Sequence, residues 1–402
     1  MVRRTTYLEK LKLFKGNQII KVITGLRRSG KSVLLAQYRD YLLSSGISET
    51  NILYINKESL EFDFLRDYND LYKFILEKFS GKLAPFYLLI DEIQEIEGWE
   101  KTINSFFAEG ACDITITGSN ARMLSTELST LLAGRYIEIS IYPLSFREFC
   151  EFRASRFPGE GKKELFNYYL RYGGMPGIHS LPLTDEAVFP FLNAIFNTAL
   201  LKDVVARNKI REVELLVRIA RFVFRNCGNI TSAKGIADFL KSQRTIISVE
   251  TVQNYLHFLS QAYIIHRVRR YDIQGKRELE YSEKFFPADA GLRFGITGYT
   301  DATISGVLEN LVYNELLYRG YSVATGQHGS FEIDFIAEKQ DEKMYFQVAY
   351  LLDQEKTIDR EFGNLLKIQD NFPKMVLSLD EYREKGRQGI IRKNIIDFLA
   401  GE

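Results

Sequence analysis

Short apolar runs alternate with helical patterns over the first part of the chain. The apolar runs predict β-strands at residues 19–24, 52–55, 86–90, 114–117 and 136–141. Apolar residues at helical spacing predict helices between them, including those over residues 31–44, 71–79 and 99–108. Strands that alternate with helices predict a parallel sheet covered on both faces.

The alternation ends near Pro143, and the pattern is helical from there to about Pro190. A Gly/Pro-rich segment at residues 172–177 interrupts it and is expected to be a turn that acts as a lid or hinge. Three amphipathic helices and a β-hairpin are then predicted, at residues 213–227, 232–241, 248–261 and 263–281. Three helices followed by a hairpin predict a winged helix.

From about Phe285 the pattern predicts a small α/β domain. Its expected elements are a helix at residues 306–319, strands at residues 331–337, 344–350 and 374–379, and a terminal helix. With 402 residues, the chain is too long for one ordinary hydrophobic core, so two to four domains are expected.

Composition narrows the class of protein. Lys and Arg number 53 against 52 Asp and Glu, so net charge indicates no partner. The three cysteines are far apart and the four histidines form no metal-ligand motif, which predicts neither disulfides nor structural zinc. No signal peptide and no uncharged apolar run of about 18 residues is evident, so we expect a cytoplasmic protein without a membrane span.

A glycine-rich loop directly follows the first predicted strand and opens the first predicted helix. Residues 25–32, GLRRSGKS, satisfy the P-loop pattern GxxxxGK[ST]. Glycines let backbone N–H groups converge on phosphates at the positive end of a helix, and the lysine reaches the β- and γ-phosphates. We therefore expect ATP and Mg²⁺ as cofactors, with nucleotide contacts from Gly25, Arg28, Ser29, Gly30, Lys31, Ser32 and Val33.

Two acidic residues end the buried strand at residues 86–90. Asp91 is expected to hold Mg²⁺ together with Ser32, and Glu92 to orient and polarise the attacking water. Because a protein that only binds nucleotide has no need of Glu92, this pair favours hydrolysis over simple binding.

Further catalytic candidates follow the next strands. Ser119 or Asn120 is expected to sense the γ-phosphate at the end of the strand at residues 114–117. Arg135 is the candidate that stabilises charge on the transferring phosphoryl group, with Arg122 and Arg28 as rivals. If Arg135 acts in trans, the protein is a homo-oligomer.

These motifs together resemble the bacterial and archaeal AAA-type ATPases whose carboxy-terminal half is a domain of unknown function, of the DUF4143 kind. The resemblance runs through nearly the whole chain. It also includes LAGRY at residues 132–136, PLSFREF at 143–149, the turn at 173–177, DAGLR at 289–293 and ENLV at 309–312. It implies an AAA+-like module followed by a winged helix and a nuclease-like fold.

Pattern and resemblance together predict an α/β chain of four parts. These are an AAA-type P-loop core at 1–145, a helical lid or linker at 146–200, a winged helix at 201–283 and a PD-(D/E)xK-like domain at 284–402. In the last part Glu309 and Asp334 match the two acids of such nucleases. Gln347 and Ala349 stand where an acid and a lysine are required, so cleavage is disfavoured.

The winged helix is the expected place for contact with DNA. Its third helix carries polar residues, and residues 266–277 carry five basic residues against Asp272, which suits phosphate contacts. The sequence therefore predicts Mg²⁺-dependent ATP hydrolysis that switches contacts with DNA or a protein. The alternatives are a nucleotide-switched binding module with little turnover, an ATP-gated nuclease or a kinase.

Overall fold

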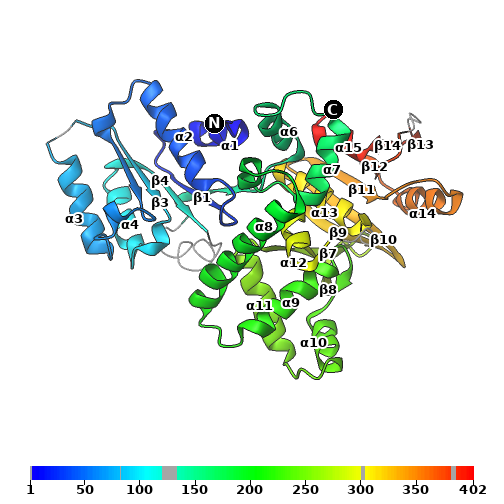
Figure 1. The fold of residues 1–402 in the computed structure, drawn as a ribbon. Coiled ribbons are helices and arrows are strands. Elements are labelled where there is room, and N and C mark those ends of the chain that lie inside the picture. The colour runs from blue at the N-terminus through cyan, green and yellow to red at the C-terminus, as the bar shows by residue number, and fades with distance from the viewer. Residues whose placement is uncertain (1, 82, 120–133, 300–303, 382–385) are drawn as a thin grey trace. The chain divides into compact units, whose positions relative to one another are not determined.

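A computed structural model describes residues 2–81, 83–119, 134–299, 304–381 and 386–402 (Figure 1). Its contacts divide the chain into two compact units. The first unit contains residues 1–141 and 261–263, and the second contains residues 142–260 and 264–402.

The first unit is built on a parallel sheet of five strands in the order β2-β3-β4-β1-β5 (Figure 1). The strands are β1 Ile20–Gly25, β2 Ile52–Asn56, β3 Phe86–Asp91, β4 Cys112–Gly118 and β5 Tyr136–Ile141. The helices are α1 Thr5–Leu13, α2 Lys31–Ser44, α3 Tyr68–Phe79 and α4 Trp99–Ala108, with short 3₁₀ turns at Glu49–Asn51, Leu60–Phe62 and Ile93–Glu95. The mixed α/β class and the parallel sheet predicted from the alternating pattern are confirmed.

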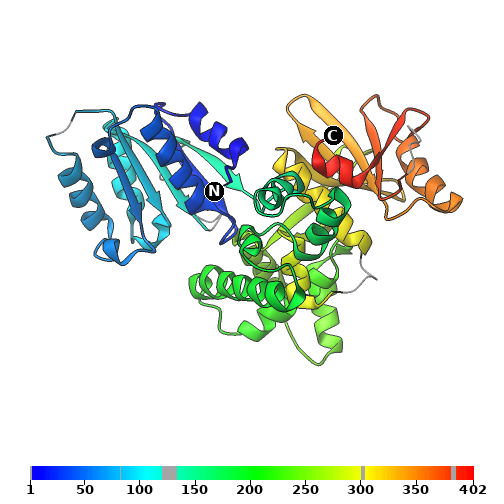
Figure 2. The same cartoon turned by 45° about the horizontal axis from the view of Figure 1, so that its top comes forward.

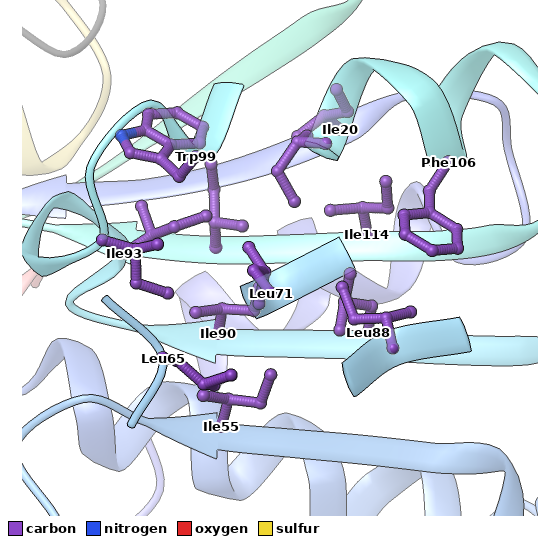
Figure 3. Close-up of a cluster of buried hydrophobic side chains, with 14 of the residues drawn as sticks. Ile20, Ile55, Leu65, Leu71, Leu88, Ile90, Ile93, Trp99, Phe106 and Ile114 are labelled. Atoms are coloured by element: carbon purple, nitrogen blue, oxygen red, sulfur yellow. The ribbon is translucent and has the colours of Figure 1, made fainter. Parts of the chain in front are cut away.

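Successive strand residues point to opposite faces of this sheet, so each face has its own apolar layer. Leu88 and Ile90 of β3 belong to a cluster that α3 and α4 cover through Leu71, Trp99 and other buried side chains (Figure 3). Leu34, Leu35 and Tyr38 of α2 are buried as well. The expected inward residue Val33 is instead 40% exposed.

The second unit begins with a helical layer. Its helices are α6 Phe146–Ala154, α7 Lys162–Tyr172, α8 Asp185–Ala199, α9 Val213–Arg225, α10 Ala233–Ser242, α11 Val249–Gln261 and α12 Ala290–Thr297, with a 3₁₀ turn at Pro176–Ser180. Ser145 and Glu148 form a capping box that fixes the start of α6. Val252, Tyr255, Leu256 and Leu259 of α11 are buried as the pattern predicts.

A mixed sheet of nine strands completes the second unit, in the order β13-β14-β12-β11-β10-β9-β7-β8-β6. Its later strands are drawn in orange to red in Figure 2. Its strands are β6 Ile230–Thr231, β7 Ile265–Asp272, β8 Arg277–Pro287, β9 Ser322–His328, β10 Phe331–Lys339, β11 Glu342–Val348, β12 Lys374–Ser378, β13 Gly386–Arg387 and β14 Ile390–Asn394. Its later helices are α13 Ile304–Tyr318, α14 Glu355–Leu366 and α15 Ile395–Ala400. Because β7 pairs with β9, the hairpin and the last α/β layer share one sheet, and the expected boundary at residue 283 falls inside β8.

The Gly/Pro turn at residues 172–177 is packed into the second unit instead of standing free as a lid. A Cβ on Gly174 would lie 2.2 Å from the carbonyl oxygen of Leu144. The buried Asp289 accepts hydrogen bonds from the N–H of Gly174 at 2.6 Å and from the N–H of Leu292 at 3.1 Å. Asp289 therefore caps α12 and holds this turn at the same time.

One helical stretch of the described residues, Asp185–Ala206, passes a length-and-composition test for a membrane span. It consists of α8 and a π-helical turn at Leu200–Ala206. Of the apolar window in this stretch, 44% is buried inside the protein. Leu192, Ile195 and Phe196 belong to the hydrophobic core. Because core helices of soluble proteins pass the same test, it is weak evidence for a membrane.

Candidate nucleotide site

The loop between β1 and α2 has the backbone geometry that a phosphate-binding loop requires. Gly25 adopts φ +139°, and a Cβ there would lie 2.2 Å from the carbonyl oxygen of Ile141. Gly30 precedes α2 with φ +104°, a conformation that side chains disfavour. The first N–H groups of a helix have no partner within that helix and point out of its start, which favours an anion there.

Lys31 is the first residue of α2 and is almost fully buried. Its Nζ donates to the carbonyl oxygens of Gly25 and Leu26, both at 3.1 Å, and lies 3.9 Å from Oε1 of Glu92. The ammonium is therefore held inside the curve of the loop. Of the other expected contacts, Ser29 is buried, whereas Arg28 and Val33 are exposed.

Asp91 ends β3 beside this loop and is completely buried. Its carboxylate accepts hydrogen bonds from the hydroxyls of Ser32 and Thr117. Burial raises the pKa of Asp91 above its ordinary value, and these hydrogen bonds oppose that rise. Its second oxygen, Oδ2, has no protein partner among the described residues. A buried carboxylate oxygen without a partner, next to a serine hydroxyl, fits the oxygen ligands that Mg²⁺ prefers.

Glu92 follows in the left-handed conformation, with φ +52°. Non-glycine residues adopt this conformation only where their surroundings hold them there. The backbone N–H of Glu92 donates to Oγ1 of Thr117 at 3.0 Å, and the amide of Gln94 donates to Oε2 of Glu92. These contacts orient the carboxylate toward Lys31.

Thr117, near the end of β4, is a site residue that sequence reasoning missed. Its hydroxyl donates to Oδ1 of Asp91 at 2.5 Å and accepts from the N–H of Glu92. One side chain thus fixes both acids. The sequence singled out Ser119 and Asn120 as sensors of the γ-phosphate and did not find Thr117, because a strand alternates faces and its register against β3 is not visible in a single sequence.

Replacing Thr117 with valine, which has the same shape, is expected to lower kcat for ATP hydrolysis about 10-fold and to raise the Mg²⁺ concentration needed for half-maximal rate. The reason is that Asp91 and Glu92 both lose a hydrogen bond, while no cavity forms. Steady-state phosphate release at varied Mg²⁺ measures both effects. Thr117→Ser keeps the hydroxyl and serves as the control; equal rates for the valine variant and the unaltered protein would refute this role.

Arg4 is a second residue that the sequence did not single out. It is 2% exposed, and its Nη1 donates to the carbonyl oxygen of Ser29 at 3.1 Å, within the P-loop. The side chain of Gln37 in α2 holds the same segment. Its oxygen accepts a hydrogen bond from the backbone N–H of Arg4, and its nitrogen donates one to the carbonyl oxygen of Val2. The residues before α1 therefore stabilise the P-loop through the backbone of Ser29.

Of the remaining catalytic candidates, the structure places Arg135 away from this site. Asn120 and its neighbour Arg122 lie outside the described residues, while Ser119 is buried directly after β4. Arg135 precedes β5, whose first residue pairs with Ile20 at the start of β1, whereas the P-loop follows the end of β1. Six strand residues span roughly 20 Å, so Arg135 cannot reach the phosphates bound by its own chain. Its guanidinium lies 5.6 Å from the ring centre of Phe107.

In the second unit, the expected DNA-contact residues of α11 are exposed or half-buried. They are Thr251, Gln253, Asn254 and His257. The hairpin is less basic than its sequence predicts, because Arg267 pairs with Glu283 and Arg269 pairs with Glu278 on the opposite strand. Lys276 and Arg277 are exposed at the turn of the hairpin.

The two nuclease-like acids lie close together in the same unit. Oδ2 of Asp334 accepts from the N–H of Val348 at 2.8 Å, and Gln347 accepts from the N–H of Asp334 at 2.7 Å. Gln347 also donates to Glu361 of α14 at 3.0 Å, and Ala349 packs in the apolar cluster beneath that helix. The positions that lack an acid and a lysine are therefore occupied by a hydrogen-bonding amide and a packing residue.

Comparison with known proteins matches two family models to the chain. Residues 17–150 match a model described as an AAA domain, and residues 163–303 match one described as a Domain of unknown function (DUF8612). An uncharacterized protein of Haemophilus influenzae is 41% identical over 400 residues, which cover 99% of this chain and 98% of that protein. The uncharacterized protein MJ1544 of Methanocaldococcus jannaschii is 31% identical over 351 residues, which cover 83% and 75% of the two chains.

Among solved structures, the chain is similar to the Walker-type ATPase PABY2304 of Pyrococcus abyssi. The two share 16% identity with a TM-score of 0.48, over 74% of this chain and 96% of that one. At that TM-score the similarity does not bear on function.

The parallel sheet and the match over residues 17–150 define an AAA domain with a P-loop in the first part of the chain. The chain belongs to the family that includes the H. influenzae and M. jannaschii proteins. In this chain the AAA domain precedes the DUF8612 region, and the DUF4143 likeness stays a prediction.

Proposed function

We propose that the chain binds ATP together with Mg²⁺ at residues 25–32 and hydrolyses it. The observation that carries this proposal is the linked set of Lys31, Ser32, Asp91 and Glu92. Ser32 bonds Asp91, whose Oδ2 has no protein partner among the described residues, and Glu92 lies 3.9 Å from the ammonium of Lys31. A phosphate-binding loop, a metal-ligand pair and a general-base candidate thus meet at one edge of the sheet.

Each residue has a separate role in this proposal. The N–H groups at the start of α2 and the Lys31 ammonium bind the β- and γ-phosphates. Ser32 and Asp91 hold Mg²⁺, which neutralises charge on the phosphate oxygens when bound. Glu92 orients the attacking water and accepts its proton, held in place by Thr117 and Gln94.

Phosphate release from ATP, with Mg²⁺ and with EDTA, tests this proposal. A Mg²⁺-dependent rate that is lost in Lys31→Ala supports an ATPase. Tight Mg²⁺-dependent ATP binding with turnover no faster than that of Glu92→Gln would instead support the second candidate, a nucleotide-switched binding module.

Arg135 contributes only if a neighbouring subunit supplies it. A hydrolysis rate per chain that rises with protein concentration would reveal such a contribution.

We also propose that the second unit contains a winged helix followed by a PD-(D/E)xK-like fold. The order α9-β6-α10-α11-β7-β8, with β6 and β7 both paired to β8, supports the winged helix. The order α13-β9-β10-β11-α14-β12, with β11 parallel to β12, supports the second fold. The proposed division is a core at 1–145, a helical linker at 146–200, a winged helix at 201–283 and the last domain at 284–402, although one sheet crosses the last boundary.

The proposed output of ATP hydrolysis is a change in contact with DNA. Gln253, Asn254 and His257 are exposed on α11, and Lys276 and Arg277 are exposed at the hairpin turn. Since Arg267 and Arg269 pair with acids and Arg270 donates to the amide oxygen of Gln327, binding is expected to be modest and to weaken as salt rises.

We expect Lys276→Ala/Arg277→Ala to weaken binding of duplex DNA about 10-fold at low salt and to flatten its salt dependence, because two phosphate contacts are removed. Fluorescence anisotropy at several salt concentrations, with and without ATP, measures this. Lys163→Ala, which removes an exposed lysine of α7, is the control. Binding that ignores salt, or a double variant that binds normally, would favour a protein partner. Cleavage of the DNA is not expected, because Gln347 and Ala349 replace the required acid and lysine.

A further inference from the structure

Lys284 of β8 is a buried lysine that contacts three carboxylates. Its side chain is 2% exposed. Its Nζ lies 2.8 Å from Oε2 of Glu309, 2.7 Å from Oε1 of Glu332 and 3.4 Å from Oδ1 of Asp334. The lysine comes from the hairpin, whereas the acids come from α13 and β10. These four residues are here named the Lys284 cluster.

In the Lys284 cluster, Lys284 is buried, Glu309 and Asp334 are mostly buried, and Glu332 is 40% exposed. A buried charge without a partner is costly, and neighbouring carboxylates repel one another. Burial and the charge of Asp334 raise the pKa of Glu309 to about 8, while its contact with Lys284 opposes that rise. The three acids therefore need a cation, and Lys284 is positioned to be it.

The same oxygens cannot serve a metal ion while they accept from Lys284. Oε2 of Glu309 and Oδ1 of Asp334 face the ammonium, and Oδ2 of Asp334 accepts from the N–H of Val348. With Lys284 in place, no group of three His, Cys, Asp or Glu side chains among the described residues is arranged to hold a metal ion.

We propose that the Lys284 ammonium occupies the place of a divalent cation in this carboxylate cluster. The cluster then holds the β7–β8 hairpin against α13 and β10 through ion pairs, without a metal ion. Removing the ammonium leaves a set of converging carboxylates that takes up a divalent ion. This inference does not depend on ATP hydrolysis, because all four residues lie in the second unit.

The test compares Lys284→Met with the unaltered lysine, both in an Asp91→Asn background that removes the metal ligand of the ATP site. In EDTA, Lys284→Met is expected to lower the midpoint of thermal unfolding by roughly 10 °C, because it leaves repelling acids buried. Adding 1 mM Mn²⁺ is expected to recover about half of that loss. Equilibrium dialysis without nucleotide is expected to find one bound Mn²⁺ per chain in the methionine variant and none with lysine.

A double variant separates the loss of charge from the loss of packing. Lys284→Met/Glu309→Gln removes one acid together with the lysine, so it is expected to be more stable in EDTA than Lys284→Met and to bind Mn²⁺ at least 10-fold more weakly. If Lys284→Met does not fold, the double variant is still expected to fold. The proposal is overturned if the protein with Lys284 binds Mn²⁺ and Asp334→Asn abolishes that binding. It is also overturned if Lys284→Met gains no Mn²⁺ response, or if neither variant folds.

Discussion

Glu92→Gln is expected to lower kcat for ATP hydrolysis by about 10²–10³-fold while ATP affinity changes less than about threefold. The physical reason is that the two acids at the end of β3 have separate roles. Asp91 and Ser32 remain to hold the metal, and Lys31 remains to bind the phosphates. Only the carboxylate that accepts the proton of the attacking water is lost. ATP binding is therefore retained, whereas the hydrolysis step is slowed.

Glu95→Gln is the matched control for this variant. It is the same substitution three residues later, at an exposed position of the 3₁₀ turn that follows Glu92. Single-turnover phosphate release with a large excess of enzyme separates chemistry from product release, and fluorescent-nucleotide titration measures affinity. A Glu92→Gln variant that hydrolyses ATP as fast as Glu95→Gln would show that another group activates the water.

The local parts of the nucleotide site could be predicted because they are encoded in adjacent residues. An apolar run followed by a glycine loop and helical spacing placed β1, the P-loop and α2, and the apolar run that ends in Asp91 placed β3. Both faces of the parallel sheet are covered, so its strands appear as short apolar runs, and β2, β4 and β5 also occur near their expected positions.

What could not be predicted depends on how distant segments meet. Thr117 reaches Asp91 through the register of β3 against β4, and Arg4 reaches Ser29 across 25 residues. The distance of Arg135 from the P-loop of its own chain is likewise set by the pairing of β5 with β1, which puts it at the other end of the strands. In the second unit, the pattern missed β9 and α14, and with them the single sheet that joins the hairpin to the last strands.

Lys284 is a partner of the carboxy-terminal acids that counting motif positions did not find. The motif requires a lysine two residues after Gln347, where this chain has Ala349. By sequence, two of the residue types that the motif requires are therefore missing. The structure brings an ammonium to Glu309 and Asp334 from β8, more than 20 residues before the first of these acids. A charge can be supplied from any element that reaches the cluster, so residue type at one position does not decide the charge of a site.

Lys31→Ala is expected to weaken ATP binding by about 10²-fold and to abolish measurable hydrolysis. The ammonium is the buried cation that faces the β- and γ-phosphates, and losing such a charge-assisted contact typically costs about 2–5 kcal/mol. AMP, which carries neither phosphate, should bind the variant nearly as well as the unaltered protein. Isothermal titration with ATP and AMP measures this difference directly.

Two controls decide whether the effect of Lys31 is chemical or structural. The ammonium also bonds the carbonyl oxygens of Gly25 and Leu26, so thermal unfolding must show that Lys31→Ala keeps its fold. Lys31→Arg retains the charge but replaces a compact ammonium with a planar guanidinium, which does not fit inside the curve of the loop, so it is expected to lose hydrolysis as well. If Lys31→Ala remained folded and bound ATP and AMP with unchanged affinities, the loop would not be the phosphate site, and the assignment of Ser32, Asp91 and Glu92 would fall with it.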